Sequence, residues 1–310
     1  MNLKDRRVFV SLESSSIGDT IAWLPMVDKF QKRHNCELIV STHHNEFFDI
    51  EKYPNLQFVK PTDIVYNLYA HYRIGVFDVD NRFIHPNHPL IVPLQQVASD
   101  RLGFHYEGNC RPEMKIKKNP FENHITLCIR STAGSKEWQR KNGWKNLIMK
   151  LVKEDYSVDV IYKRPGAELK SESESLWRIL RDLNINEDEY EKIKHQVTIV
   201  FNQSLEDVTK VISQSALFIG LPSGLSWVAW ALEVPVIIIS GFSLEYAEFE
   251  EQHRVQNFDV CNGCWNNPDF KFDKGDWYWC PKHKGTDRQF ECTKQITEDA
   301  VYKLVAKILP

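Results

Sequence analysis

The chain has 310 residues, of which 42% are hydrophobic and 26% charged, with a formal net charge of −3 and a pI near 6.4. This composition is typical of a globular protein, and the weak net charge argues against nucleic acid or an anionic membrane surface as a partner. The N-terminal residues lack the apolar run of a secretory signal. Seven cysteines, an odd number, argue against a secreted disulfide framework. We therefore expect a cytoplasmic protein, long enough for two domains of roughly 150 residues each.

The first segment with a clear pattern opens the predicted N-terminal domain, residues 1–115. An apolar strand at Arg7–Leu12 is followed by the small-residue turn Ser14–Asp19, a helix from about Asp19 to His34 and a second strand at Glu37–Ser41. This order is that of a Rossmann-like domain. Asp19 would lie at the carboxyl edge of the sheet, so it is the best acid–base candidate, although an acid in a first helical turn is equally explained by helix capping.

The middle of this domain has weaker patterns. Leu56–Val59 and Arg73–Val76 read as strands, and Leu94–Leu102 reads as a helix. His85 and His88 lie beside prolines and are candidate metal ligands, but we interpret them as ordinary surface residues.

The C-terminal domain, residues 116–310, begins with a buried strand at His124–Arg130. The turn after it brings Ser131 and Thr132 close to Lys136, and hydroxyls beside an ammonium suit an oxyanion. A solvated surface loop explains the same residues. A helix is expected from Gly143, and the elements expected next are the strand Val158–Tyr162, the helix Glu168–Leu183 and the strand Gln196–Phe201.

The most apolar segment, Ser215–Phe242, is long enough to span a membrane, but prolines and glycines divide it. We read a strand at Ala216–Gly220, a helix at Leu225–Leu232 and a strand at Val234–Ser240, which together form a βαβ unit. The turn before the helix, with Ser223 at its centre, places free backbone N–H groups at a helix N-terminus, where phosphate binds readily. An ordinary capped turn has the same pattern.

Four cysteines near the C-terminus have the spacing C-x2-C-x15-C-x11-C. They are Cys261, Cys264, Cys280 and Cys292. Such spacing can close a tetrahedral thiolate site for zinc or iron, whereas two disulfides or unrelated thiols are the alternatives. The residues between them, here called the cysteine loop (261–292), contain few aliphatic side chains, so we expect the metal to be structural.

Several of these motifs in combination resemble those of the bacterial ADP-heptose heptosyltransferases of lipopolysaccharide synthesis. They resemble still more closely those of the autotransporter heptosyltransferases, which modify adhesins. The matching segments are Ser16–Pro25, Pro93–Asp100, Ser131–Ala133 with Lys136 and Trp138, Gly143–Trp144, Ser223–Trp227, Ile239–Phe242 and the four cysteines. The lipopolysaccharide enzymes differ by an aspartate at the position of Pro222 and a histidine at the position of Trp227.

The resemblance implies an α/β GT-B fold, with two Rossmann-like domains and the nucleotide sugar on the C-terminal one. It implies that Asp19 is the catalytic base and Lys136 the phosphate-binding cation. The implied donor-binding residues are Ser131, Thr132, Lys136, Ser223, Gly224, Leu225, Ser226 and Trp227. It also implies one metal ion per chain on the four cysteines, reported as iron in the family, with zinc as the alternative.

The function that we expect is inverting transfer of heptose from ADP-heptose to Ser or Thr hydroxyls of an acceptor protein such as an autotransporter adhesin. The enzyme could also form a homo-oligomer. One alternative is the same chemistry with another nucleotide sugar or with a glycan or lipopolysaccharide acceptor. An alternative of another class is a non-catalytic, metal-stapled scaffold that binds nucleotide sugars.

Overall fold

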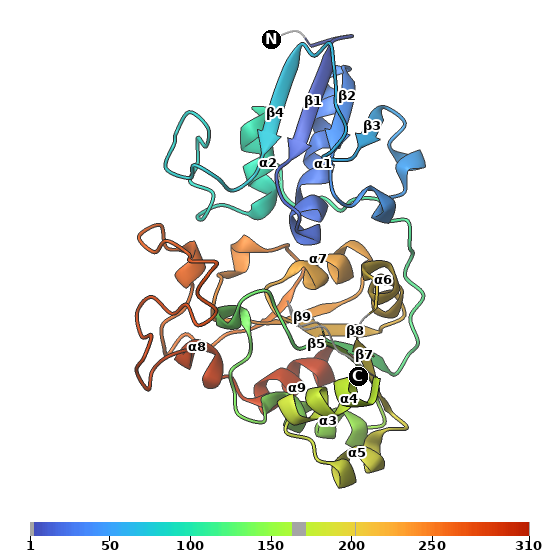
Figure 1. The fold of residues 1–310 in the computed structure, drawn as a ribbon, viewed down its shortest axis with the longest axis vertical. Coiled ribbons are helices and arrows are strands. Elements are labelled where there is room, and N and C mark those ends of the chain that lie inside the picture. Colours follow the sequence, from blue (N-terminus) through green and yellow to red (C-terminus); the bar gives the residue numbers. More distant parts are fainter. Residues whose placement is uncertain (1–2, 163–171, 202, 310) are drawn as a thin grey trace. The chain divides into compact units, whose positions relative to one another are not determined.

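The computed structural model describes residues 3–162, 172–201 and 203–309. The chain divides into two compact units (Figure 1). Unit 1 comprises Met1–Lys117 with Glu245–Glu250, and unit 2 comprises Lys118–Leu244 with Glu251–Pro310.

Unit 1 is built on a four-stranded parallel sheet in the order β3-β2-β1-β4. The strands are β1 (Arg7–Leu12), β2 (Glu37–Ser41), β3 (Leu56–Val59) and β4 (Ala70–Ile74). Helices α1 (Ile17–His34) and α2 (Leu94–Leu102) pack against each other and against the sheet, and the short 3-10 helices η1 (Asn45–Phe47) and η2 (Ile50–Lys52) follow β2. The order reverses between β1 and β4, which makes the carboxyl end of β1 a topological switch point.

Helix α1 differs from its prediction at its start. It begins at Ile17, so Asp19 lies in its first turn, and it continues through Pro25 to His34. It ends at Asn35, whose left-handed backbone (φ 47°) lets the cap N–H bond back to Gln31. A proline inside a helix removes a backbone hydrogen bond. The first two turns of α1 are almost entirely buried, so packing offsets the cost of Pro25.

Unit 2 contains a six-stranded parallel sheet in the order β10-β9-β8-β5-β6-β7. The strands are β5 (His124–Cys128), β6 (Ser157–Tyr162), β7 (Val197–Phe201), β8 (Leu217–Gly220), β9 (Val236–Ile239) and β10 (His253–Val255). Numbered from β5, this is the 3-2-1-4-5-6 order of a dinucleotide-binding sheet. The switch point lies between β5 and β8, whose strands pair through Ile125–Leu217 and Leu127–Ile219.

Helices cover both faces of this sheet (Figure 1). Helices α6 (Leu205–Ser213) and α7 (Gly224–Ala231) lie on one face, and α3 (Gly143–Lys153), α4 (Glu172–Asp182), α5 (Glu187–Ile193) and α9 (Glu298–Ile308) lie on the other. Because both faces are covered, β8 and β9 are buried at every position and read as continuous apolar runs. The segment expected to form strand, helix and strand is therefore β8, α7 and β9. No helix in the described part of the chain is long and apolar enough to cross a membrane.

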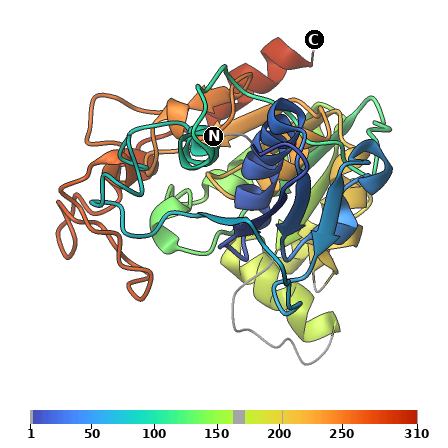
Figure 2. The same cartoon turned by 90° about the horizontal axis from the view of Figure 1, so that it is seen from above.

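The cysteine loop lies outside these layers. Figures 1 and 2 both show it in orange to red as a set of loops beside the sheet of unit 2. Its regular structure consists of the short helices η5 (Cys264–Asn266) and α8 (Glu291–Lys294). It packs around a small aromatic cluster rather than the aliphatic core of the unit.

Two sequence interpretations need correction. His85 and His88 are buried, with exposed fractions of 1% and 3%, and are not surface residues. His85 Nε2 lies 2.7 Å from the carbonyl of Phe77, and His88 Nδ1 accepts the Leu90 N–H. Both imidazoles therefore satisfy loop backbone, which explains their burial without a metal.

Strand β10 and helix α5 were not expected, and residues 168–171 of the predicted helix Glu168–Leu183 lie outside the described residues.

Candidate functional site

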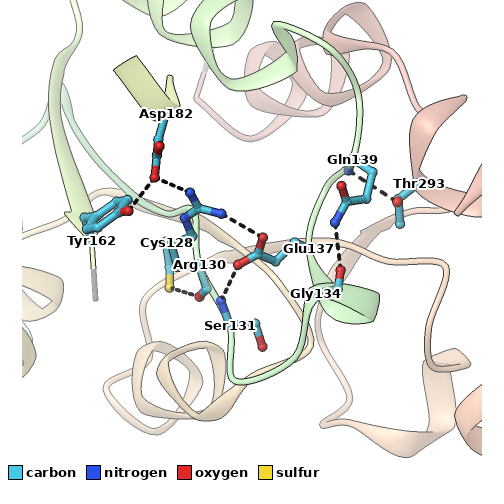
Figure 3. Close-up of polar contacts among 9 residues, drawn as sticks. All are labelled: Cys128, Arg130, Ser131, Gly134, Glu137, Gln139, Tyr162, Asp182 and Thr293. Atoms are coloured by element: carbon cyan, nitrogen blue, oxygen red, sulfur yellow. Dashed lines mark hydrogen bonds and ion pairs between the residues drawn. The ribbon is translucent and has the colours of Figure 1, made fainter. Parts of the chain in front are cut away.

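The loop after β5, residues 129–138, is closed by one buried carboxylate. Glu137 accepts the backbone N–H of Ser131 at 3.3 Å and the guanidinium of Arg130 at 2.9 Å (Figure 3). Arg130 also donates to Asp182 at 2.5 Å. Burial would lower the pKa of Arg130, but the charges of Glu137 and Asp182 outweigh it and the pKa is raised. These charge-assisted bonds give the loop one defined shape.

Lys136 ends a 3-10 turn, η3 (Gly134–Lys136), inside this loop and is half-buried. Its Nζ atom lies 5.3 Å from the ring centroid of Phe242, the residue that follows β9 by three positions. In the same segment, Gln139 Nε2 donates to the carbonyl of Gly134 at 2.8 Å (Figure 3). The turn that carries the ammonium is thus held by the Gln139 side chain, and the ammonium itself lies near the Phe242 ring.

A second loop joins β8 to α7 at the same edge of the sheet. Ser223 is the N-cap residue of α7, but its side chain makes no capping hydrogen bond, and Gly224 and Leu225 form the first turn. Ser226 is fully buried and donates to the carbonyl of Leu221 at 2.6 Å, so its hydroxyl holds the turn.

Trp227, in the same turn of α7, is only 4% exposed. Its ring packs edge-on against Trp230, with ring centroids 5.5 Å apart. Of the candidates in this loop, Ser223, Gly224 and Leu225 are the more accessible, whereas Ser226 and Trp227 are buried.

Three serine hydroxyls of the two loops are buried without a hydrogen bond of normal geometry to any described residue. They belong to Ser131, Ser135 and Ser223. Ser223 lies close to the Cys128 thiol and slightly offsets the effect of burial, which raises the pKa of that thiol to about 12. Buried hydroxyls nearly always have partners in native proteins, so three without one in two loops at the same edge of the sheet favour a ligand site there. Together with Lys136 and the N-terminus of α7, they offer donors to an anion, while Thr132 is exposed on the same loop.

Asp19 occupies the equivalent place in unit 1, after the first strand of its sheet. It lies in the first turn of α1 and is half-buried. The Ser14 hydroxyl donates to Asp19 Oδ2 at 2.5 Å, and the same hydroxyl accepts the backbone N–H of Ser16 at 3.1 Å. The carboxylate is therefore oriented by the turn.

The four candidate metal ligands all lie in unit 2. Burial raises the pKa of the Cys264 thiol to about 11 and that of Cys292 to about 12, and in both cases the charges of neighbouring cysteines add to the effect. Cys261 and Cys280 act on the thiol of Cys264, and Cys261, Cys264 and Cys280 act on that of Cys292. The thiols therefore influence one another's protonation, but of the four only Cys261 belongs to a compact group of possible ligand atoms among the described residues. A metal shared by the four cysteines would displace their protons.

A histidine and a glutamate join this group. The ligand atoms of Cys261, His283 and Glu291 lie within 4.8 Å of one another. Glu291 is buried and accepts two hydrogen bonds from Arg288, which together with Cys261 hold its pKa at about 2 despite burial. Thiolate and imidazole donors suit zinc or iron, so the residues fit the expected metal. The signal for His283 was present in the sequence, because it follows Cys280 with the x2 spacing of a metal-binding knuckle.

The sharp turn of the cysteine loop is hydrogen-bonded to the end of β9. Gly263 adopts a left-handed backbone (φ 69°) between Cys261 and Cys264. Its N–H donates to the carbonyl of Gly241 at 2.9 Å, and the Trp265 N–H donates to that of Phe242 at 3.0 Å. The loop is thus anchored to the residues that follow β9.

Comparison with known proteins identifies the family to which the chain belongs. Residues 86–261 match the family model for glycosyltransferase family 9 (heptosyltransferase). The chain is 34% identical to the autotransporter heptosyltransferase Aah of Escherichia coli, over 96% of this chain and 73% of Aah. It is 32% identical to the autotransporter heptosyltransferase TibC of E. coli O78:H11, over 99% of this chain and 73% of TibC. It is also 29% identical to the inactive autotransporter heptosyltransferase BimC of Burkholderia thailandensis, over 97% of this chain and 68% of BimC.

The fold matches the crystal structure of TibC, described as an iron-containing, dodecameric glycosyltransferase, with a TM-score of 0.83, 30% identity and coverage of 99% of this chain and 77% of that one. A second TibC structure, in complex with ADP-D-β-D-heptose, matches equally well. The predicted GT-B architecture is confirmed. The chain has two Rossmann-like units, matches the family model over residues 86–261 and has relatives at more than 30% identity. It therefore belongs to glycosyltransferase family 9, the heptosyltransferases.

Proposed function

We propose that this chain transfers heptose from ADP-heptose to Ser or Thr hydroxyls of an acceptor protein such as an autotransporter adhesin. The observation that carries the proposal is the pair of loops at the switch point of unit 2. There, Lys136 and the unpaired hydroxyls of Ser131 and Ser223 match the oxygens of a diphosphate. The similarity to Aah, and to TibC with its bound ADP-D-β-D-heptose, supports the choice of donor and acceptor.

The proposed reaction is a single displacement with inversion. Asp19 accepts the proton of the acceptor hydroxyl while the oxygen of that hydroxyl attacks the anomeric carbon of the heptose. The bond from that carbon to the diphosphate oxygen breaks, and ADP leaves with the bonding electron pair. Lys136 and the N–H groups at the start of α7 stabilise the negative charge that grows on the diphosphate. Thr132, Gly224 and Leu225 line the same loops, with Ser226 and Trp227 supporting the second loop from within.

We assign the cysteine loop one iron ion, with zinc as the alternative, held by the thiolates of Cys261, Cys264, Cys280 and Cys292. A site with four protein ligands has no position for substrate, so the ion supplies folding energy to a loop with little apolar surface. His283 and Glu291 lie next to Cys261 as partners that orient it. The iron in the related TibC supports this assignment.

We also propose that the enzyme acts in the cytoplasm and self-associates. The odd number of cysteines favours a reducing compartment, and the dodecameric assembly of the related TibC supports self-association. Light scattering of the purified protein tests the assembly. A monomer at micromolar concentration would contradict it.

The alternative of another class, a scaffold that binds nucleotide sugars without catalysis, is favoured by one finding: the related BimC is described as inactive. A scaffold would bind ADP through the two loops but would have no use for Asp19 as a base.

Co-expression with an autotransporter passenger domain, followed by intact-mass and peptide mass spectrometry, tests the proposal. We expect peptides heavier by one or more heptose residues on Ser or Thr, and no modification with the Asp19→Asn variant. An unmodified passenger, together with ADP binding and no release of ADP from ADP-heptose, would support the scaffold. Release of ADP only with a lipopolysaccharide core acceptor would support the other enzymatic alternative, a glycosyltransferase that acts on lipopolysaccharide.

A further inference from the structure

Phe242 contacts both the cysteine loop and the lysine of the phosphate site. It is 4% exposed and belongs to an aromatic cluster, here defined as Phe242, Trp265, Phe272 and Trp279. Its ring stacks on that of Trp265, with centroids 5.6 Å apart and an interplanar angle of 26°. It meets Phe272 and Trp279 edge-on at 5.5 and 5.9 Å. The same ring lies 5.3 Å from Lys136 Nζ.

The two loops also touch at a second place. A Cβ atom at position 134 would lie only 2.6 Å from Trp277 Nε1, so glycine is needed for the close approach of this tryptophan of the cysteine loop. On the other side of the same turn, the Gln139 N–H donates to the Thr293 hydroxyl at 3.3 Å, just after Cys292 (Figure 3). The segment that carries Lys136 thus contacts the cysteine loop at Trp277 and the residue that follows the loop, Thr293.

The end of β9 is tied to the metal-ligand segment as well. A Cβ atom at position 241 would lie 2.7 Å from Cys292 Sγ, so Gly241 is packed directly against that cysteine. Together with the hydrogen bonds from Gly263 and Trp265, this contact fixes the backbone of Phe242 relative to the four cysteines. The ring of Phe242 therefore takes its position from the cysteine loop.

We propose that Phe242 is a positioning residue for Lys136, and that the cysteine loop thereby sets how well the enzyme binds the donor diphosphate. A lysine ammonium moves on a flexible four-carbon chain, and an aromatic face restrains it by cation–π attraction without neutralising its charge. A restrained ammonium loses less freedom when it binds phosphate. This proposal rests on the proposed role of Lys136, and it gives the cysteine loop a part in donor binding in addition to its structural one.

The test is a double-mutant cycle on ADP binding, measured by calorimetry with the metal-loaded protein. Phe242→Leu should weaken ADP binding about three- to tenfold, as loss of a partly buried cation–π contact predicts. Phe242→Tyr, which keeps the ring, should stay near wild type. In the Lys136→Met background, Phe242→Leu should cause no further loss, because the two residues act through one contact.

Phe270→Leu is the matched control. It is the same substitution in a ring of the cysteine loop that packs against the cluster of Phe242, and the Phe270 ring lies 5.7 Å from Lys282 Nζ instead of near Lys136. Its ADP affinity should equal that of wild type. Metal content and melting temperature are recorded for every variant, and Phe242→Met, whose flexible side chain fills gaps more readily, replaces Phe242→Leu if the latter does not fold.

The outcomes distinguish the role of Lys136 in donor binding from the positioning role of Phe242. If Lys136→Met weakens ADP binding while Phe242→Leu does not, Phe242 has no positioning role and the proposed function stands. If the two changes are additive, or if Phe270→Leu weakens binding equally, Phe242 acts only through packing and the proposal is overturned. If Lys136→Met itself leaves ADP binding unchanged, the proposed role of the lysine fails and the positioning role fails with it.

Discussion

The candidate catalytic and phosphate-binding residues lie at strand ends, whereas the candidate metal ligands lie in a loop with little regular structure. Asp19 follows β1, and the loops of Ser131 and Ser223 follow β5 and β8. Their positions are set by parallel sheets that are buried on both faces in unit 2. The cysteine loop packs instead on a cluster of aromatic rings and is tied to β9 through a few backbone hydrogen bonds.

This difference separates two ways of fixing a side chain. A residue at the end of a buried strand takes its place from the core, so changing its functional group should alter chemistry and leave folding intact. A residue in the cysteine loop takes its place from the other ligands, so its loss should alter folding first. The four predictions below test that distinction.

The largest effect is expected at Asp19. Asp19→Asn keeps the shape and the hydrogen bond from Ser14 but cannot accept the proton, so transfer should fall by about 10²- to 10⁴-fold. ADP affinity and melting temperature should stay near wild type, since the helix is held by its buried face. Asp28→Asn, at a half-buried position of the same helix that pairs with Lys32 instead of Ser14, is the control. Turnover close to that of wild type would remove Asp19 from the chemistry.

The metal site should respond through stability. Cys264→Ser should reduce the metal content from about one ion per chain to about none, and it should lower the melting temperature and the yield. His283→Ala should retain the metal with affinity reduced about 10- to 100-fold, as expected for a residue that orients a ligand. Elemental analysis and thermal denaturation distinguish the two. Complete metal loss in His283→Ala with retention in Cys264→Ser would replace the four-thiolate site with one built on Cys261, His283 and Glu291.

A smaller effect is expected at Lys136. Removing an ion-paired hydrogen bond to phosphate in Lys136→Met should weaken ADP binding about 10- to 100-fold, because bonds to charged groups are worth about 1.5–3 kcal/mol. Transfer should fall together with affinity, since the diphosphate is contacted in both the ground and transition states. Lys141→Met, on the exposed part of the next turn, should match wild type in the same titration. Equal affinities for both variants would make Lys136 an ordinary surface lysine.

The smallest effect is expected at Ser226. Its hydroxyl is committed to the Leu221 carbonyl inside unit 2. Ser226→Ala should therefore lower the free energy of unfolding by about 1–3 kcal/mol, the cost of a buried carbonyl without a partner. ADP affinity should change little. A large loss of ADP affinity at unchanged stability would instead make Ser226 a direct donor ligand.

The sequence predicted the buried parallel strands of unit 2 except β10, because they read as apolar runs bounded by small residues. It placed Asp19, Lys136 and Ser223 at strand ends for the same reason. In unit 1 it placed a strand at Arg73–Val76, whereas the half-exposed β4 is Ala70–Ile74. Glu137 was not recognised, because its importance depends on Arg130 and Asp182, which the fold brings together from distant segments. Glu291 was missed likewise, since a glutamate beside a cysteine has no distinct spacing.

His85 and His88 show the opposite failure. Their flanking prolines are typical of a surface loop, yet the loop folds over both rings. Single-sequence patterns report local conformation, and burial of a loop depends on what covers it.

The central claim is that two strand-end loops of unit 2 hold the donor diphosphate. A crystal structure of this protein with ADP tests it most directly. We expect the β-phosphate oxygens within about 3 Å of Lys136 Nζ and of at least one of the Ser131 and Ser223 hydroxyls, with the start of α7 pointing at the phosphates. ADP bound elsewhere, with these two hydroxyls and Lys136 away from the phosphates, would contradict the account.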